Sequence, residues 1–182
     1  EAKGTFKELM QIADDTGQLF NASAELYTRT YRALGDKANS AELLQFTKTI
    51  QQATVVSGAN ATEAGAAIIQ LSQGLASGTL RGEEFNSVAE QMPIILEILQ
   101  KSLGKTRGEL RKMAEAGELT PQLIIGAMKE ARDEVQRQYD AMPHTIGRAI
   151  NELSNAWLQF IGQTDKAVPV ISLVAGAISA LA

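Results

Sequence analysis

Three regularly spaced glycines between Gln70 and Pro93 constrain the fold of this chain more than any other feature. Gly74, Gly78 and Gly82 recur every four residues. Each glycine inside a helix costs about 1 kcal/mol relative to alanine. Such a run therefore indicates an interruption between two helices, or a place where two helix backbones approach closely. The stretch predicts a helix, a tight connection and a second helix.

The predicted second helix has recognisable ends. Glu83 and Glu84 stand at its start, where the helix dipole favours carboxylates. Pro93 ends it, because the residue before a proline is displaced from the α region, and the same proline suits the first position of a following helix. Adjacent helical residues do not face each other, so the two glutamates do not form an acid–base pair without a third polar group. We interpret them as helix-start residues.

Apolar residues recur at helical spacing along nearly the whole chain, and no segment alternates in the manner of a half-buried strand. The sequence therefore predicts an all-α fold of about six to eight irregularly packed helices joined by short loops, with no sheet. The most apolar helix, over 93–103, is expected at the centre of the core. Segments with helical spacing or helix-end signals lie over 5–14, 18–34, 40–56, from 62 to the glycines, from 83 to 92, over 93–103 and 106–116, from 121 to about 140, and over 146–160.

Capping residues support these boundaries. Ser40 is a suitable N-cap for the helix that follows it, because its hydroxyl accepts from a backbone N–H that has no partner. Thr106 and Glu109 have the spacing of a capping box. Thr120 followed by Pro121 supplies an N-cap and a proline at the first helical position.

Composition limits the chemistry of the chain. Of 182 residues, 45% are hydrophobic and only 5% aromatic, so the core is expected to consist mainly of aliphatic side chains. There is no cysteine, which excludes disulfides and thiolate metal ligands. His144 is the single histidine, so neither a histidine pair for a metal nor a catalytic triad can form. The net charge of -4 gives no general attraction to nucleic acid or anionic lipid. We therefore expect no enzymatic activity, no cofactor, no metal and no small-molecule substrate.

A basic cluster next to two short predicted helices suggests a second hypothesis, a DNA-binding domain that resembles a helix-turn-helix. A recognition helix should present polar or basic residues early in its length. The candidate, which begins at Pro121, is mostly apolar, so a solvated face or an acidic partner surface is favoured over DNA. The cluster consists of Lys101, Lys105, Arg107, Arg111 and Lys112.

The last predicted helix carries Trp157 and Phe160 on one apolar face with Ile150 and Leu153. This face either belongs to the core or contacts helices of other copies. We place a boundary near residue 163, so that residues 1–163 form the helical domain and 164–182 an apolar C-terminal extension. Residues 168–182 carry no charge but fall short of the roughly 20 residues of a membrane span. Because the chain begins with Glu1, we expect it to be part of a longer protein.

The glycine-rich stretch reads Gln-Leu-x-Gln, then Ser-Gly-x-Leu-Arg-Gly-Glu-Glu-Phe, then Glu-x-x-Pro. In this order it resembles the shared helical domain of bacteriophage tail tape measure proteins. Met92 departs from the pattern, which has a small residue before the proline. Further landmarks keep the family's order over roughly residues 5–162: Asp15-Thr16-Gly17, Leu26-Tyr27-Thr28, Phe46-Thr47-Lys48-Thr49-Ile50, Val56-Ser57-Gly58, Leu103-Gly104, Gly117-Glu118-Leu119 and Ala156-Trp157.

The resemblance implies a structural protein that occupies the lumen of a growing tail, sets its length and leaves ahead of the genome. Implied partners are the tail tube, the tail tip or initiator, tail assembly chaperones and further copies of the chain, in the virion and, during assembly, in the host cytoplasm. Contact of the apolar extension with a membrane during ejection is a further expectation. Candidate interaction or packing residues are Gly74, Gly78, Leu80, Arg81, Gly82, Glu83, Glu84, Phe85, Trp157 and Phe160.

Overall fold

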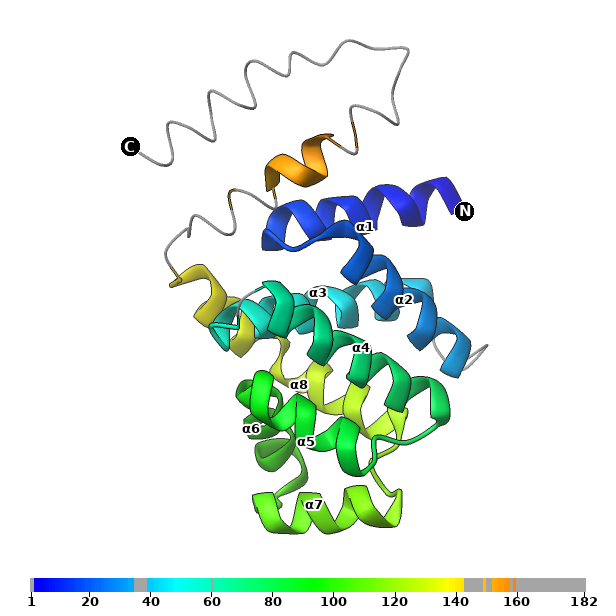
Figure 1. Cartoon of the computed structure of the whole chain (residues 1–182), viewed down its shortest axis with the longest axis vertical. Helices are drawn as coiled ribbons and strands as arrows, with labels where there is room; N and C mark the ends of the chain where they lie inside the picture. Colours follow the sequence, from blue (N-terminus) through cyan, green and yellow to red (C-terminus); the bar gives the residue numbers. More distant parts are fainter. Residues whose placement is uncertain are drawn as a thin grey trace.

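The computed structural model of the chain describes residues 2–34, 39–59, 61–142, 149, 152–157 and 159. All regular structure in these residues is helical, without a strand, which confirms the all-α prediction (Figure 1). A short helical segment over 152–157 follows the labelled helices. These are α1 (Ala2–Thr16), α2 (Phe20–Leu34), α3 (Ser40–Val56), α4 (Ala61–Ser77), α5 (Gly82–Gln91), α6 (Pro93–Leu103), α7 (Arg107–Ala116) and α8 (Pro121–Asp140).

The predicted caps hold at two helices and fail at a third. Thr106 and Glu109 form the capping box of α7, with the Thr106 N–H donating to Glu109 Oε2 at 2.9 Å. Thr120 caps α8 by accepting from the backbone N–H of Leu123. The prediction for Ser40 was wrong, because the cap of α3 is Asn39, whose Oδ1 accepts from the Glu42 N–H at 2.8 Å. Asparagine and serine are about equally favoured as N-caps, so sequence preference could not separate these neighbours.

Helix α3 is heavily enclosed: ten of its 17 residues are buried, and it packs against α1, α2, α6 and α8. It carries polar side chains into the interior, and several bond within the helix. Thr47 Oγ1 donates to the Leu43 carbonyl, and Thr54 Oγ1 to the Ile50 carbonyl, each at 2.8 Å. Such local bonds meet the hydrogen-bonding need of a buried hydroxyl.

Two buried glutamines connect α3 to its neighbours. Gln51 Nε2 donates to Ser23 Oγ of α2 at 3.1 Å, and Gln52 Nε2 donates to Gln136 Oε1 of α8 at 2.7 Å. Both glutamine side chains are almost fully buried. Hydrogen bonds from side-chain amides are directional, so these two restrict the positions of α2 and α8 against α3.

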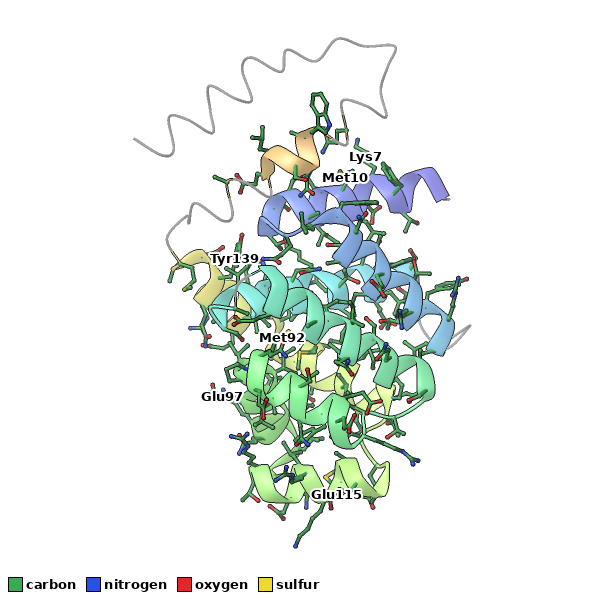
Figure 2. All side chains as sticks on the ribbon, viewed as in Figure 1. Lys7, Met10, Met92, Glu97, Glu115 and Tyr139 are labelled. Carbon is green, nitrogen blue, oxygen red and sulfur yellow. The ribbon has the colours of Figure 1, made fainter. Side chains whose placement is uncertain are left out.

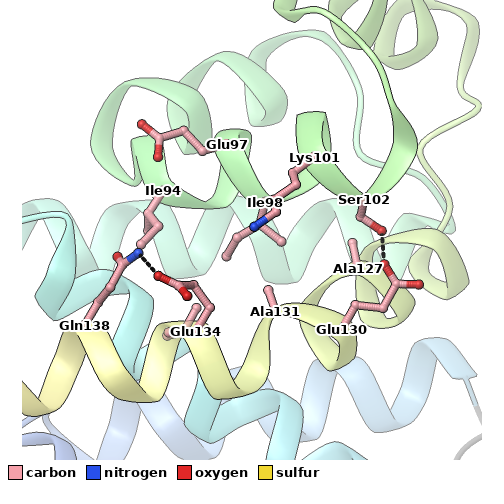
Figure 3. A pocket seen from close by; sticks show the side chains of 11 residues that line it. Ile94, Glu97, Ile98, Lys101, Ser102, Ala127, Glu130, Ala131, Glu134 and Gln138 are labelled. Carbon is pink, nitrogen blue, oxygen red and sulfur yellow. Dashed lines mark hydrogen bonds between the residues drawn. The ribbon is translucent and has the colours of Figure 1, made fainter.

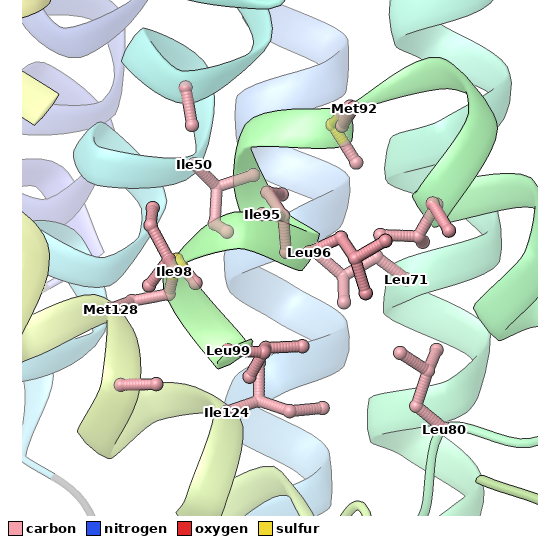
Figure 4. Packing of buried hydrophobic residues seen from close by; sticks show 14 of the residues in the cluster. Ile50, Leu71, Leu80, Met92, Ile95, Leu96, Ile98, Leu99, Ile124 and Met128 are labelled. Carbon is pink, nitrogen blue, oxygen red and sulfur yellow. The ribbon is translucent and has the colours of Figure 1, made fainter. Parts of the chain in front are cut away.

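The apolar core surrounds α6, as predicted from its composition. Close packing in this interior joins side chains from five helices (Figure 4). The residues are Ile50 of α3, Leu71 of α4, Val88 of α5, Ile95, Leu96, Ile98 and Leu99 of α6, and Ile124 and Met128 of α8.

The glycines of the predicted interruption have different roles. Helix α4 continues through Gly74 and ends at Ser77, and Gly78 follows with a φ of 90° that favours glycine. Gly74 is a close approach: a Cβ there would lie 2.6 Å from Leu80 Cδ1 and 3.1 Å from Leu80 Cα. The chain therefore turns back after α4 and packs Leu80 onto the bare face of Gly74.

Met92, the residue that departs from the family pattern, is fully buried between α5 and α6 (Figure 2). Its sulfur lies 3.2 Å from Thr54 Oγ1 of α3, the hydroxyl that donates to the Ile50 carbonyl. The long, flexible side chain thus fills interior space next to a buried hydroxyl, which a small residue would leave open.

We predict that Met92→Ala lowers the free energy of unfolding by about 2–5 kcal/mol, because it removes buried methylene groups and leaves a cavity. Urea unfolding followed by circular dichroism measures this loss. Met113→Ala on α7 is the control, since Met113 is only partly buried against the core, and its loss should be clearly smaller. A loss below about 1 kcal/mol for Met92→Ala would mean that the core collapses around the small residue.

The two interior glycines of α4 provide a matched pair. A Cβ at Gly65 meets no atom within 4 Å, whereas a Cβ at Gly74 collides with Leu80. Gly65→Ala should stabilise the domain by roughly 0.5–1 kcal/mol, and Gly74→Ala should destabilise it by roughly 1–3 kcal/mol through overpacking. Thermal unfolding of the two variants tests this, and equal shifts of the same sign would contradict the close approach.

Candidate functional site

The segment that follows Gly78 joins α4 and α5 to the distant turn between α7 and α8. The Leu80 N–H donates to the Leu119 carbonyl at 2.9 Å, and both leucine side chains are fully buried. The Arg81 guanidinium covers Gly117, where a Cβ would lie 2.7 Å from Arg81 Nη2. Gly117 also has a positive φ of 73°. The positive φ favours glycine at this position, whereas the guanidinium is the end of a flexible side chain and can move aside.

Of the predicted site residues in the glycine-rich stretch, Gly74, Leu80 and Phe85 make packing contacts and Arg81 lies against Gly117. Phe85 is buried in the same core, and Gly82 begins α5. Glu83 and Glu84 occupy the first turn of α5, whose N-cap, Arg81, makes no capping bond with its side chain. Their carboxylates thus lie at the positive end of the helix dipole, as predicted.

No group of three or more metal-ligating side chains occurs in the part of the chain that the structure describes. His144 lies outside those residues. Nor does any helix among the described residues have the length and apolar character needed to cross a membrane. Residues 160–182, which include Phe160 and the predicted domain boundary, are likewise outside them.

The basic cluster does not accompany a recognition helix. Lys105 Nζ lies 3.8 Å from Glu109 Oε1, and Arg111 Nη2 donates to Asn86 Oδ1 of α5 at 3.2 Å. The first turn of α8 has Pro121 and Ile124 buried in the domain. A helix that enters a DNA groove must expose this region, so the geometry does not favour the DNA-binding hypothesis.

A groove of about 420 Å³ runs between α6 and α8 (Figure 3). Its apolar lining comes from Ile94, Ile98, Ala127, Ala131 and Val135, and its polar lining from Glu97, Lys101, Ser102, Glu130, Glu134 and Gln138. Three carboxylates face one ammonium group there, so its rim is predominantly acidic.

Hydrogen bonds order two of these carboxylates. Ser102 Oγ donates to Glu130 Oε2 at 2.5 Å across the groove, and Gln138 Nε2 donates to Glu134 Oε1 at 2.8 Å. The bond from Gln138, followed by the charge of Arg137, holds the pKa of Glu134 below its ordinary value. Glu134 is therefore fully ionised at neutral pH.

A second groove, of about 540 Å³, lies between α3 and α8. Leu34, Phe46, Ile125 and Gly126 contribute to its lining, and Lys129 Nζ of α8 lies 3.2 Å from Glu42 Oε1 of α3. Gly126 is exposed in the interior of α8, and a Cβ there would meet no atom within 4 Å.

Neither groove was predicted from the sequence. Gly126 was the available signal, because an interior helix glycine without a turn beside it lacks an evident structural reason. The paired surfaces of α3, α6 and α8 could not be inferred from helical periodicity.

The segment over 152–159 attaches to the α1–α2 turn through polar side chains. Asn155 Oδ1 accepts from the Phe20 N–H at 3.1 Å, and Asn155 Nδ2 donates to the Gln18 carbonyl at 2.8 Å. Gln159 Nε2 donates to Asp14 Oδ2 at 2.7 Å. Burial raises the pKa of Asp14, and the hydrogen bond from Gln159 opposes that shift.

The apolar face of this segment points away from the core. Leu153 is 40% and Trp157 54% exposed, so the core interpretation fails for these two residues. Their alternative role, contact with helices of other copies of the chain, remains a prediction.

Comparisons with curated proteins and with solved structures gave no match. A family model described as "Tape measure protein" matches residues 1–166, which include all the described helices. Its extent agrees with the ordered landmarks of the sequence, and the helical fold is the one that the resemblance implied. The chain therefore belongs to the tape measure protein family and is a structural component of the phage tail.

Proposed function

We propose that this domain anchors the tape measure protein within the assembling tail by binding other proteins. The ruler that sets tail length would lie in other parts of the parent protein. The partners would be the tail tube, the tail tip or initiator, the assembly chaperones or further copies of the chain. Assembly would take place in the host cytoplasm, and the protein would end in the tail lumen and leave before the genome.

The shape of the domain supports an anchor over a ruler. An extended helix gains about 1.5 Å per residue, so residue number can be converted into length only where helices do not fold back. Here the longest helix, α8, has 20 residues, and its neighbours pack alongside it. Residues added to such a domain would alter its loops and packing, and they would not lengthen it in proportion to their number.

The observation that carries the proposal is the groove between α3 and α8, and in particular Gly126. An exposed glycine in a helix interior costs about 1 kcal/mol relative to alanine, and no described atom approaches closely enough to require it. A bare helix surface does permit close approach by a partner backbone. Gly126 is therefore explained by a protein that packs into this groove.

The α6–α8 groove adds electrostatic selectivity on the other side of α8. Among the lining residues Glu97, Glu130 and Glu134 outnumber Lys101, although Arg137 beside the groove pairs with Glu134, and the lining between them is partly apolar. This arrangement suits an amphipathic helix with basic residues beside its apolar stripe. Helix α8 would thus present two docking surfaces with different chemistry.

Deletion of residues 1–163 from the parent protein in the phage tests the anchor role. We expect tail assembly to be lost, because the ruler would no longer be attached to its partners. Negative-stain microscopy of lysates measures the number and length of tails. Viable phage whose tails are shortened in proportion to the deletion would refute the proposal.

Gly126→Gln tests the α3–α8 groove. Glutamine favours the helix by up to about 1 kcal/mol over glycine, so the purified domain should unfold at the same or a higher temperature. Because the new side chain occupies the groove, tail yield in the phage should fall at least about tenfold, which corresponds to about 1.4 kcal/mol of lost binding.

The matched control is Gly108→Gln on α7, which introduces the same side chain where a Cβ also meets no atom and which lines neither groove. It should assemble normal numbers of tails. Normal assembly by Gly126→Gln would show that the α3–α8 groove binds no essential partner.

A further inference from the structure

We propose that the exposed apolar face of residues 152–157 is the docking surface for residues 168–182 of the same chain. This inference concerns a contact within one molecule, so it goes beyond the anchoring function and does not depend on it. It also assigns a position to the apolar extension that the sequence analysis could only delimit.

The orientation of residues 152–157 is opposite to that of an ordinary amphipathic helix on a domain surface. Asn155 is fully buried and bonds to both sides of the α1–α2 turn. Leu153 and Trp157 are four residues apart and therefore share one helix face, while Asn155 lies about 200° around the helix from each. The polar side chain thus makes the attachment and the apolar pair points outward, whereas the apolar stripe normally faces the core.

Another large apolar side chain is exposed on the helix that receives this segment. Phe6 of α1 is 54% exposed, and its ring centroid lies 5.0 Å from that of Phe20. Phe20 is the residue whose backbone N–H donates to Asn155. Residues 152–157 and α1 therefore both expose apolar side chains, although the contact that attaches this segment to the domain is polar.

The size of this surface favours an occupant from the same chain. Leu153 and the half-exposed Trp157 together present roughly 200 Å², whereas a stable complex between separate proteins buries about 800 Å² on each partner. A segment tethered by residues 160–167 has an effective concentration on the order of millimolar. At that effective concentration a small apolar contact can form within one chain, although the same contact would be too weak to hold two separate molecules together.

Residues 168–182 have the composition that such a surface requires. They contain no charged side chain and seven large aliphatic ones, namely Val168, Val170, Ile171, Leu173, Val174, Ile178 and Leu181. As a helix they would extend about 22 Å, enough to lie along the two turns that carry Leu153 and Trp157. Exposure of apolar side chains to water is unfavourable, and contact between the two surfaces would remove apolar area of each from water.

Trp157 makes the contact measurable, because it is the single tryptophan of the chain. The experiment uses the full chain and compares Ile171→Asp with Ile178→Asp, combined in one protein, against Ser172→Asp with Ser179→Asp in another. Each pair is seven residues apart and adds the same charge, but only the first pair alters large apolar side chains. Acrylamide quenching of Trp157 fluorescence and circular dichroism are measured on both variants and on the unaltered chain.

We expect the quenching constant to rise roughly twofold in the isoleucine variant, as a covered indole becomes exposed, with emission shifted to longer wavelength. The serine variant should match the unaltered chain, and all three should keep the same helical signal. The values for the unaltered chain should not change with protein concentration.

Unchanged quenching in the isoleucine variant would overturn the proposal, and so would an equal rise in the serine variant. Quenching that falls as concentration rises, together with a dimer by light scattering, would instead assign the surface to a second copy. None of these outcomes depends on tail assembly, so failure here is distinct from failure of the anchoring function.

Discussion

The burial of α3 is the constraint on which the rest of this domain depends. A helix enclosed by α1, α2, α6 and α8 needs partners for its polar side chains, because an unsatisfied buried group costs about 1–3 kcal/mol. Its threonines bond to the preceding turn, and the Nε2 groups of Gln51 and Gln52 donate to α2 and α8, whereas their Oε1 atoms have no partner among the described residues. Apolar packing alone would permit many arrangements of helices. These directional bonds restrict where the neighbouring helices can lie.

The position of α8 links this core to the proposed function. Its inner face packs against α3 and α6, and its flanks border the two grooves. Its start is located by the turn at Gly117, which contacts Arg81 and carries the Leu119 carbonyl that binds Leu80. The stretch from Gly74 to Phe85, which most resembles the family, thus holds α8 in place. The two grooves that we propose as partner surfaces are lined by residues outside this stretch.

Polar contacts also determine how the chain leaves the domain. Asn155 and Gln159 bind the α1–α2 turn and Asp14, so the segment is attached by hydrogen bonds and its apolar side chains face outward. Such an attachment can position an apolar extension without burying it in the core.

Local signals in the sequence were sufficient for the helices and most of their ends. The capping box at Thr106, the Thr120-Pro121 pair and the glycines at 78 and 117 act through the backbone of their own segments, so they can be read without tertiary information. Contacts between distant segments decided the remainder. Gly74 lies within a continuous helix and packs against Leu80. Asn39, and not Ser40, caps α3, and Trp157 lies outside the core. The grooves beside α8 arise where three helices meet, and periodicity along one helix contains no information about the distance to another.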